Sequence, residues 1–525
     1  MSSPEDLRRD HLRSDDVWSG DVRSDDVRSD DLRRRSTPFE MTSAELRAAG
    51  HALVDAIAEH LRALPGLPVS PNETPSSIRR LLPRDELPEQ GVPAGELLDE
   101  ASRLLFEHSL FNGHPRFFGY ITSSAAPAGA LADLLAASVN PNVGGWQLSP
   151  MASEIEGQCV RWIADLLGFP RGGGLLVSGG NMANFVAFLA ARRAAGGEEL
   201  RRRGTRALPE LVAYGSAETH TWFEKAADLF GLGTESLRWI PVDDRQRMSV
   251  PALRAAIAED RAAGRRPFMI VGNAGTVSTG AVDPLVEIAE LARAEELWLH
   301  LDGAYGAFAA LAEGAPADLV DGIPLADSIA VDPHKWLYAP LEAGCVLVRD
   351  REALRDTFSY TPPYYRFTGE DEPRDNYYEL GMQNSRGFRA LKVWLAIRQA
   401  GRRGYASSIA QDVALARALH RAADGHPELE ARTCNLSITT FRYVPPGIDS
   451  ADESAREELN AINEELLAVL RESGELFLSN AVVDGDFLLR ACVVNFRTAL
   501  GDVEAVPEIV CRHGRTVAER HRSLA

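Results

Sequence analysis

Two short runs of the sequence contain residue types that could perform chemistry together. Lys335 lies in the run DPHKW at 332–336, directly after the apolar stretch Ser328–Val331. A lysine at the end of a buried strand can reach a cleft, where desolvation lowers its pKa and lets it form a Schiff base with an aldehyde. Asp302 follows a second apolar stretch, Leu297–Leu301, and precedes small residues. A buried carboxylate there could keep a heterocyclic ring nitrogen protonated, which makes the ring an electron sink.

Three further turns follow predicted strands and offer groups that a phosphorylated ring would need. In the run LVSGGNMAN at 176–184, the backbone at Gly180 and Asn181 opens a helix, and its N–H groups and the helix dipole favour a phosphate. This run is neither GxGxxG nor GxxxxGK[ST], so neither a dinucleotide nor a nucleoside triphosphate is predicted. His220 follows another strand and could stack on a ring, and Thr276 in GTVSTG at 275–280 could meet a ring oxygen. Taken alone, each run is more typical of an ordinary turn.

Strands that alternate with helices between about 114 and 400 would position these residues. Six buried strands are predicted, at Gly174–Val177, Glu210–Tyr214, Arg265–Asn273, Leu297–Leu301, Ser328–Val331 and Cys345–Val348. This alternation predicts an α/β fold with a mostly parallel sheet and helices on both of its faces. Active sites in such folds lie at the carboxyl ends of the strands, where the runs described above begin.

The two ends of the chain differ from this central part. Residues 1–37 repeat a charged five-residue unit (RSDDV twice, WSGDV and RSDDL), which predicts a disordered tail. Residues 38–113 predict helices, because Thr42–Glu45 is a capping-box pattern and a second amphipathic stretch covers 94–110. Such a segment cannot close a core of its own and would pack on something else. Residues 401–525 predict a smaller α+β domain, with a helix over 451–473 and a hairpin around Asp484-Gly485.

The composition is that of an ordinary globular protein. The 525 residues are 45% hydrophobic and 25% charged, enough for two or three domains. The formal net charge of -20 argues against a nucleic-acid partner. The five cysteines are scattered without a CxxC pair, which indicates free thiols in a reducing compartment, and no metal site is predicted. We see no bilayer-spanning apolar stretch and no signal-peptide pattern, so we expect a cytoplasmic protein without a membrane partner.

The runs DPHKW and HLDGAYG (300–306), in order after the three turns, resemble those of group II pyridoxal-phosphate-dependent amino-acid decarboxylases. That family includes the aromatic-L-amino-acid, histidine, glutamate and cysteine-sulfinate decarboxylases, and the pattern is closest to the first. The resemblance covers the chain from about residue 38 to its end. It implies an aspartate-aminotransferase-type (fold type I) transferase fold, with a central, mostly parallel seven-stranded sheet and a smaller α+β C-terminal domain. It also implies a homodimer with active sites at the subunit interface, each partner wrapped by the other's N-terminal helices.

The resemblance implies the residues that would hold the cofactor ring, pyridoxal 5'-phosphate. Lys335 would carry the cofactor as a Schiff base, and Asp302 would pair with the pyridine nitrogen. His220 would stack on the ring, Thr276 would face the ring hydroxyl, and Ala304 would lie against the ring face.

The resemblance also implies the surroundings of the phosphate. Gly180, Asn181 and His334 would lie at the phosphate or beside it. Ser385, in the run QNSRGFR at 383–389, belongs to a segment that would reach the phosphate of the neighbouring subunit. Asp332 stands where aromatic decarboxylases usually have asparagine, so its contact is expected to differ from theirs.

A mobile loop over the substrate is a further implication of the resemblance. In this chain the loop runs from Phe358 to Arg374, and the spacing from Phe358 favours Tyr364, with Tyr365 as the alternative, as the group that protonates the substrate carbon. A tyrosine at that position in relatives goes with plain decarboxylation, and a phenylalanine goes with aldehyde formation. His220 would assist Tyr364.

Two runs of the sequence are expected at the substrate pocket, and only one of them resembles the corresponding run of aromatic decarboxylases. The run HPRFFGY at 114–120 resembles the aromatic-decarboxylase pocket, with Tyr120 and Ile121 facing the substrate side chain. The run NVGGW at 142–146 has asparagine and glycine where those enzymes place isoleucine and phenylalanine, so a roomier or differently shaped pocket is expected. Val143 and Trp146 are the substrate contacts predicted there, although Trp146 is equally typical of a buried core residue.

The sequence therefore predicts a carboxy-lyase that converts an L-amino acid to its amine and CO2. An aromatic substrate such as tyrosine, phenylalanine, DOPA or tryptophan is expected. Two alternatives keep the cofactor: an aldehyde synthase, and a decarboxylase of a non-aromatic amino acid. A third alternative, a non-catalytic scaffold with the same fold, conflicts with an intact set of Lys335, Asp302 and His220.

Overall fold

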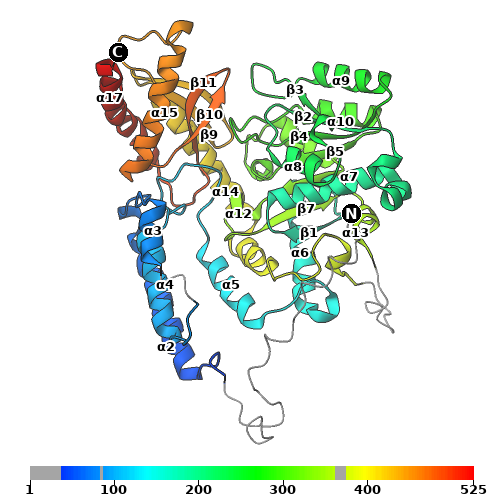
Figure 1. Ribbon diagram of the computed structural model, residues 1–525, viewed down its shortest axis with the longest axis horizontal. Coiled ribbons are helices and arrows are strands. Elements are labelled where there is room, and N and C mark those ends of the chain that lie inside the picture. The colour runs from blue at the N-terminus through cyan, green and yellow to red at the C-terminus, as the bar shows by residue number, and fades with distance from the viewer. Residues whose placement is uncertain (1–36, 83–86, 361–373, 525) are drawn as a thin grey trace, which may run out of the picture. The chain divides into compact units, whose positions relative to one another are not determined.

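The computed structural model describes residues 37–82, 87–360 and 374–524 (Figure 1). The chain divides into two compact units. One contains Met1–Arg62 and Arg79–Glu107, and the other contains Ala63–Ile78 and His108–Ala525. Within the described residues, no helix combines the length and the hydropathy that a bilayer crossing requires.

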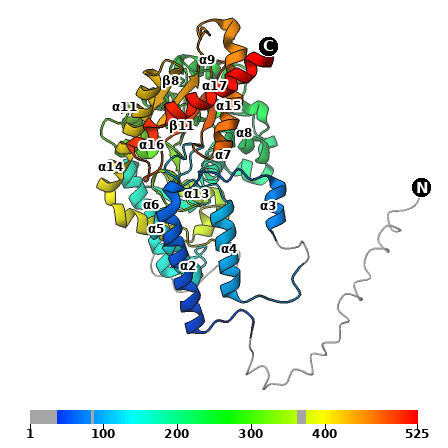
Figure 2. The same cartoon turned by 90° about the vertical axis from the view of Figure 1, so that its left-hand side faces the viewer.

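The first unit consists mainly of two helices, α2 (Ser43–Ala63) and α4 (Ala94–His108), which lie side by side in Figure 2. The predicted capping box is confirmed, because the Thr42 hydroxyl accepts from the Glu45 N–H at 3.2 Å and the Glu45 carboxylate accepts from the Thr42 N–H at 2.7 Å. His60 stacks on Phe106 with ring centroids 4.3 Å apart. Neither helix has a buried residue, as expected of a segment without a core of its own.

The second unit is built on a seven-stranded sheet with strand order β1-β7-β6-β5-β4-β2-β3. Its strands are β1 (Gly173–Val177), β2 (Leu211–Ser216), β3 (Leu237–Ile240), β4 (Arg266–Asn273), β5 (Trp298–Asp302), β6 (Ser328–Val331) and β7 (Gly344–Val348). Strand β7 runs antiparallel to β1 and β6, and the other pairs are parallel. The mostly parallel sheet is confirmed. The sequence did not predict β3, an edge strand of four residues.

Helices cover both faces of this sheet, as Figure 1 shows. The remaining helices of the described residues are α3 (Pro75–Leu81), which spans the boundary between the two units, α5 (Pro127–Val139), α6 (Pro150–Leu167), α7 (Gly180–Arg203), α8 (Trp222–Leu229), α9 (Val250–Ala262), α10 (Leu285–Ala294), α11 (Ala317–Gly322), α12 (Pro333–Trp336), α13 (Glu352–Phe358), α14 (Ala390–Asp424), α15 (Arg456–Ser473), α16 (Leu500–Glu504) and α17 (Val506–Leu524). Successive strand residues point to opposite faces. Leu176 packs in the core formed with α6, α9 and α10, whereas Leu175 and Val177 pack in the core formed with α7. Burial on both faces explains why the strands are continuously apolar.

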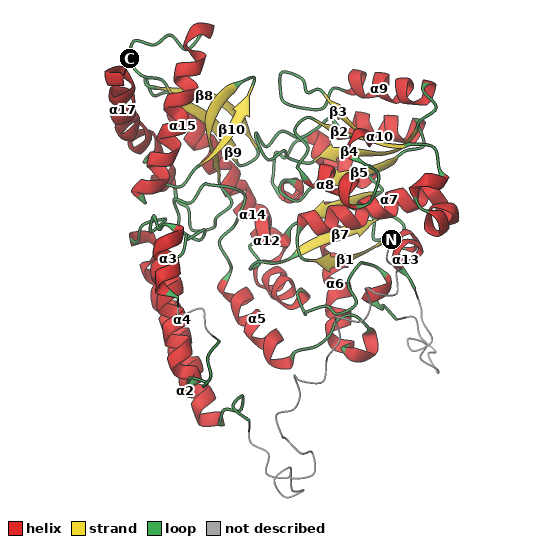
Figure 3. Ribbon diagram, viewed as in Figure 1, coloured by secondary structure: helices red, strands yellow, loops and turns green. Residues whose placement is uncertain are grey.

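A second, four-stranded sheet has the order β10-β11-β9-β8 and is antiparallel throughout (Figure 3). Its strands are β8 (Leu429–Asn435), β9 (Ile438–Tyr443), β10 (Ser479–Val483) and β11 (Asp486–Cys492). The predicted hairpin is confirmed, because Asp484 and Gly485 join β10 to β11 with φ angles of 53° and 85°. Apolar residues of α14, α15 and α17 share one core with this sheet. The smaller α+β part predicted at the C-terminal end is therefore present.

Candidate active site

The loops that follow β1, β2, β4, β5 and β6 converge on one pocket at the carboxyl ends of these strands. The pocket is lined by Gly180, Asn181, Asn184, Glu218, His220, Asn273, Gly275, Thr276, Val277, Asp302, Ala304, Tyr305, Asp332 and Lys335. A larger cavity of about 570 Å³, between Asp244–Arg247 and Arg432–Leu436, contains none of the predicted site residues. The chemistry therefore points to the pocket of Lys335, as the rule for open α/β sheets requires.

Asp302 is the last residue of β5, and two donors fix its carboxylate. The Trp222 indole N–H, at the start of α8, donates to Oδ2 at 2.8 Å, and the Ala304 N–H donates to Oδ1 at 3.2 Å. Trp222 is fully buried and packs edge-on against His300. The sequence did not single out Trp222, although it lies only two residues after His220.

Lys335 lies in the short helix α12 that follows β6. Its Nζ is 3.1 Å from Oδ2 of Asp332, and its side chain is 19% exposed. Asp332 is itself buried, and its Oδ1 has no hydrogen-bond partner within the described part of the chain. The lysine therefore lines the pocket while it is paired with a buried carboxylate.

His220 lies in the loop between β2 and α8. Its Nδ1 accepts a hydrogen bond from the Trp222 N–H at 3.3 Å, which leaves Nε2 to carry the proton of the neutral ring. Partial burial lowers the pKa of His220, and the nearby Asp302 carboxylate opposes that shift. A neutral, flat ring that borders the pocket is suited to stacking.

The turn between β1 and α7 passes close to other chain segments, and this requires glycine. Gly179 has a φ of 152°, a conformation that other residues rarely adopt. A Cβ at Gly180 would lie 2.8 Å from the Ala304 Cβ and 2.8 Å from Oδ2 of Asp332. Asn181, at the first turn of α7, is exposed and lines the pocket. The turn therefore presents backbone N–H groups to the pocket at the positive end of a long helix.

A hydroxyl turn follows β4 and also lines the pocket. The Thr276 hydroxyl lies 3.1 Å from that of Thr279 and is buried. Beside it, Asp283 accepts from the Asn273 backbone N–H at 2.8 Å and from its side-chain amide at 2.9 Å. Burial raises the pKa of Asp283 to about 6. These bonds hold the end of β4 against the turn.

Two of the predicted cofactor residues, His334 and Ser385, are not among the lining residues of this pocket. The Nδ1 of His334 lies 2.8 Å from the Ala343 carbonyl, its Nε2 lies 3.7 Å from Asp332, and burial lowers its pKa. Ser385 is exposed. Tyr364 lies outside the described residues.

The predicted substrate residues are also not among the lining residues of the Lys335 pocket of the same chain. Tyr120 is 56% exposed with a φ of 50°, and its ring lies 6.0 Å from that of Phe477. Ile121 packs on the large core, and Val143 is fully buried. The Trp146 indole N–H donates to the Glu154 carboxylate at 2.9 Å.

The glycine at 144 does not leave empty space. A Cβ there would lie 2.1 Å from the Asn384 carbonyl oxygen, so the backbone of the 383–389 segment occupies that volume. The same segment is anchored by Arg386, which is buried and pairs with the buried Glu156 at 2.5 Å. Arg386 also donates to the Val143 carbonyl at 3.0 Å. Within one chain, Gly144 therefore does not enlarge the pocket at this position.

The residues around Lys335 fit pyridoxal 5'-phosphate. The glycine turn would receive the phosphate, because Gly180 and Asn181 line the pocket at the N-terminus of α7. Asp302 is held by two donors and can still accept from a protonated ring nitrogen. Lys335 supplies the amine for a Schiff base.

Comparisons with known proteins agree with this fit. The family described as the pyridoxal-dependent decarboxylase conserved domain matches residues 75–443. An aromatic-L-amino-acid decarboxylase of Bacillus atrophaeus is 35% identical over 88% of this chain and 94% of its own length. A phenylacetaldehyde synthase of Arabidopsis thaliana is 29% identical over 86% of this chain and 92% of its own. The crystal structure of Oryza sativa TDC with PLP and tryptamine superposes with a TM-score of 0.84 at 28% identity, covering 92% of this chain and 99% of that one.

The fold, the pocket and these comparisons agree, and the chain belongs to the pyridoxal-dependent decarboxylases, as a PLP-dependent amino-acid carboxy-lyase.

Proposed function

We propose that this protein decarboxylates an aromatic L-amino acid to the corresponding amine and CO2. The observation that carries the proposal is the convergence of Lys335, Asp302 and His220 on one pocket beside the Gly180 turn. The printed activity of the Bacillus atrophaeus relative and the tryptamine in the Oryza sativa structure support the aromatic class.

Each residue has a proposed task. Pyridoxal phosphate, when bound, supplies an aldehyde for amines and a protonated ring that accepts the electrons left when CO2 departs. Lys335 holds it covalently, and Asp302, fixed by Trp222, keeps the ring nitrogen protonated. His220 stacks on the ring as a neutral imidazole. The N–H groups at Gly180 and the amide of Asn181 bind the phosphate.

Tyr364 is the proposed proton donor to the substrate carbon, assisted by His220. A tyrosine rather than a phenylalanine at this position supports amine formation. The second candidate function is aldehyde synthesis, which is favoured by one specific observation, the similarity to a phenylacetaldehyde synthase. The two functions differ in product, so one assay distinguishes them.

We also propose that the protein works as a cytoplasmic homodimer. Helix α5 exposes Leu131, Leu134 and Leu135 in a single chain, and the two helices of the first unit expose Leu46 and Leu105. Exposed leucines that share a helix face are typical of subunit interfaces. A partner subunit would also supply the substrate-contacting and phosphate-contacting residues that lie outside the Lys335 pocket of one chain. The five free cysteines support a reducing compartment.

The decisive experiment is a product analysis of the cofactor-loaded protein. L-Tyrosine, L-phenylalanine, L-DOPA and L-tryptophan would be compared with L-glutamate, L-histidine and L-cysteine sulfinate, and CO2, amine, aldehyde and hydrogen peroxide would be measured together. We expect amine and CO2 in equal amounts from the aromatic set. Aldehyde with peroxide would establish the second function, and turnover confined to the other set would refute the aromatic proposal. The Lys335→Ala variant is the negative control, because it should lose the visible cofactor absorbance and the turnover together.

A further inference from the structure

A buried carboxylate lies directly beneath the turn that would bind the phosphate. Asp332 is 2% exposed, and its Oδ2 is 2.8 Å from the position of a Cβ on Gly180. It precedes α12, but its side chain makes no capping hydrogen bond to that helix. Its Oδ1 is buried and has no hydrogen-bond partner among the described residues. Helix capping therefore does not account for this aspartate.

Lys335 is the positive charge that balances this carboxylate. Its Nζ lies 3.1 Å from Oδ2 of Asp332, closer than Nε2 of His334 at 3.7 Å. Burial lowers the pKa of His334, so that its ring is neutral near pH 7. His220 and Cys345 also sense the charge of Asp332, and burial lowers the pKa of the imidazole and raises that of the thiol, so both stay neutral. The ion pair with Lys335 is therefore the main electrostatic contact of Asp332.

This arrangement creates two obstacles to cofactor capture. An ammonium group has no lone pair and cannot attack an aldehyde. A carboxylate beneath the phosphate turn would repel the phosphate, because the buried Asp332 carboxylate is poorly screened by water. The transfer of one proton from Lys335 to Asp332 removes both obstacles, because it leaves a neutral amine and a neutral carboxylic acid.

We propose, as an extension of the function given above, that Asp332 is the proton acceptor that activates Lys335. The Nζ–H bond breaks and an O–H bond forms at Oδ2 of Asp332, while the electron pair remains on Nζ. That pair then forms the bond to the aldehyde carbon, and the carbonyl oxygen leaves as water with the two protons that the amine nitrogen gives up as the C=N bond forms. The 3.1 Å separation allows a direct transfer.

The test measures cofactor capture rather than turnover. Cofactor-free wild-type protein and the Asp332→Asn variant would be mixed with pyridoxal phosphate or with pyridoxal in a stopped-flow instrument, and the visible absorbance would be followed as a function of pH. Asp133→Asn is the matched control, since Asp133 and Lys392 form another aspartate–lysine pair with the same 3.1 Å spacing outside the Lys335 pocket. Asp332→Ala is a second variant that cannot accept a proton, and near-ultraviolet circular dichroism would verify its fold.

We expect Asp332→Asn to capture both aldehydes about 10-fold to about 100-fold more slowly near neutral pH. Its rate should rise about tenfold per pH unit as Lys335 loses its proton to solvent, whereas the wild-type and Asp133→Asn rates should change little. Asp332→Ala should behave like Asp332→Asn.

Two outcomes would overturn the inference. In one, Asp332→Asn keeps the wild-type rate and pH profile. In the other, it captures pyridoxal phosphate faster but pyridoxal at an unchanged rate, which would mean that Asp332 only repels the phosphate. Rapid capture by the wild-type protein without CO2 release from any amino acid would refute the proposed function alone. A wild-type protein that captures neither aldehyde would contradict both.

Discussion

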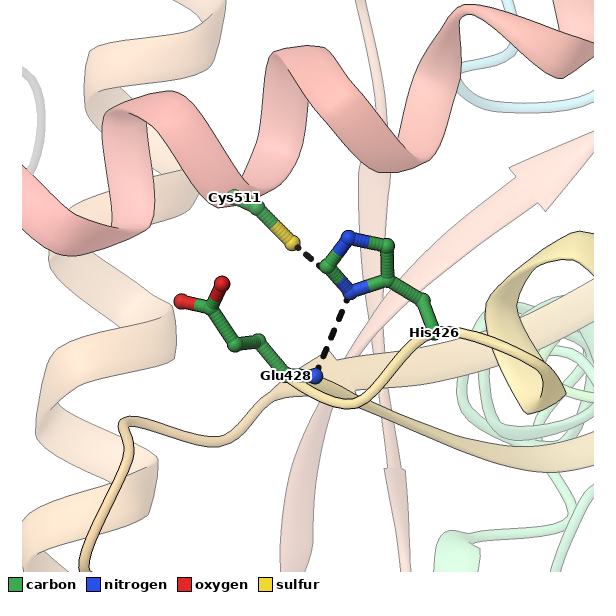
Figure 4. A group of neighbouring side chains, drawn as sticks. All are labelled: His426, Glu428 and Cys511. Carbon is green, nitrogen blue, oxygen red and sulfur yellow. Dashed lines mark hydrogen bonds between the residues drawn. The ribbon is translucent and has the colours of Figure 1, made fainter.

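Two clusters of titratable side chains in this protein look alike in composition but differ in what their atoms contact. One is the Lys335 pocket at the carboxyl ends of the large sheet. The other joins His426, Glu428 and Cys511 in the C-terminal part, where the candidate ligand atoms all lie within 4.8 Å of one another (Figure 4). By composition, the second cluster is a better candidate for a metal site than the first.

The atoms of the second cluster are already bonded. The Nδ1 of His426 accepts from the Glu428 N–H at 3.2 Å and contacts the Cys511 sulfur at 3.4 Å (Figure 4). The Glu428 carboxylate accepts two kinds of donor, the Arg515 guanidinium at 2.6 Å and the Tyr443 hydroxyl at 3.2 Å. Burial raises the pKa of Cys511 to about 12, so the thiolate that a metal needs is disfavoured.

The Lys335 pocket has the opposite character. Oδ1 of Asp332 and Oε2 of Glu218 are buried there without hydrogen-bond partners in the described residues. Polar atoms left without partners inside a protein are costly, and they are expected where a ligand completes the contacts. The two clusters therefore differ in that the Lys335 pocket has carboxylate oxygens without partners, whereas the carboxylate of the second cluster is bonded.

The strongest test of the difference between the two clusters is to remove one carboxylate from each. Asp302→Asn should lower kcat/KM by about 1000-fold, equivalent to about 4 kcal/mol of transition-state stabilisation, because the amide cannot keep the ring nitrogen protonated. Steady-state kinetics of the cofactor-loaded protein measure this loss.

Glu428→Gln is the matched control for Asp302→Asn. It removes the ion pair with Arg515 and should leave kcat/KM unchanged while lowering stability slightly. Equal losses of kcat/KM in the two variants would contradict the distinction between the clusters.

His300 extends the comparison because it is hydrogen-bonded to Asn184 of the pocket lining and both of its ring nitrogens have partners. Its Nε2 lies 2.7 Å from the Asn184 amide oxygen and its Nδ1 lies 2.8 Å from the Ser328 hydroxyl. Burial lowers its pKa to about 4. The unfolded chain protonates this histidine near its ordinary pKa and the folded chain does not, so stability falls as the pH drops from about 6.5 to about 4, by about 3 kcal/mol in total.

The measurement is the urea dependence of unfolding at about pH 6.5 and about pH 5, for the wild-type protein and His300→Gln. The wild-type loss over this interval should exceed that of the variant by about 2 kcal/mol. Burial raises the pKa of Asp412 to about 7, so Asp412 makes stability rise as the pH falls. This contribution is the same in both proteins, so the difference between their pH dependences isolates His300. An identical pH dependence would mean that His300 is protonated in the folded state.

Much of this arrangement follows from the sequence because parallel strands end at the same edge of a sheet. Residues that come directly after apolar strands, such as Asp302 and Lys335, therefore meet although they are far apart in the chain. The strand bounds themselves agree within two residues for all six predicted strands. The first two strands of the small sheet, β8 and β9, were missed because Leu429–Asn435 carries charged residues that partner Arg442 and Asp486 rather than a simple alternation.

Contacts across long sequence separations could not be predicted in the same way. Trp222 reaches Asp302 from the first residue of α8, and only the packing of α8 on the sheet brings its indole N–H to Oδ2. The Asn384 carbonyl that fills the space beside Gly144 likewise depends on the buried pair of Arg386 and Glu156. The predicted substrate residues do not line the Lys335 pocket of the same chain, so their role stays a prediction.

Trp222 tests the importance of the contact that was not predicted. Trp222→Phe keeps the buried ring but removes the donor to Asp302, so we expect kcat to fall about tenfold, or about 1.4 kcal/mol, with little change in KM. The absorbance of the bound cofactor should also become more dependent on pH, because Asp302 loses a fixed donor. Trp239→Phe, at the partly exposed edge strand β3, is the control for loss of an indole. Equal kinetics in the two variants would assign Trp222 a packing role only.

Added zinc is the smallest expected effect and bears on the second cluster directly. Because Nδ1 of His426 and the Glu428 carboxylate already have donors, Zn²⁺ would have to break these bonds and the contact with Arg515 before it could bind. We expect micromolar Zn²⁺ to raise the thermal midpoint of the wild-type protein by less than about 2 °C, and Cys511→Ser to respond in the same way. Calorimetry with both proteins measures this difference. A zinc-dependent stabilisation that Cys511→Ser abolishes would show that hydrogen bonds within a cluster do not exclude a metal, and it would remove the basis for separating the two clusters by their unsatisfied atoms.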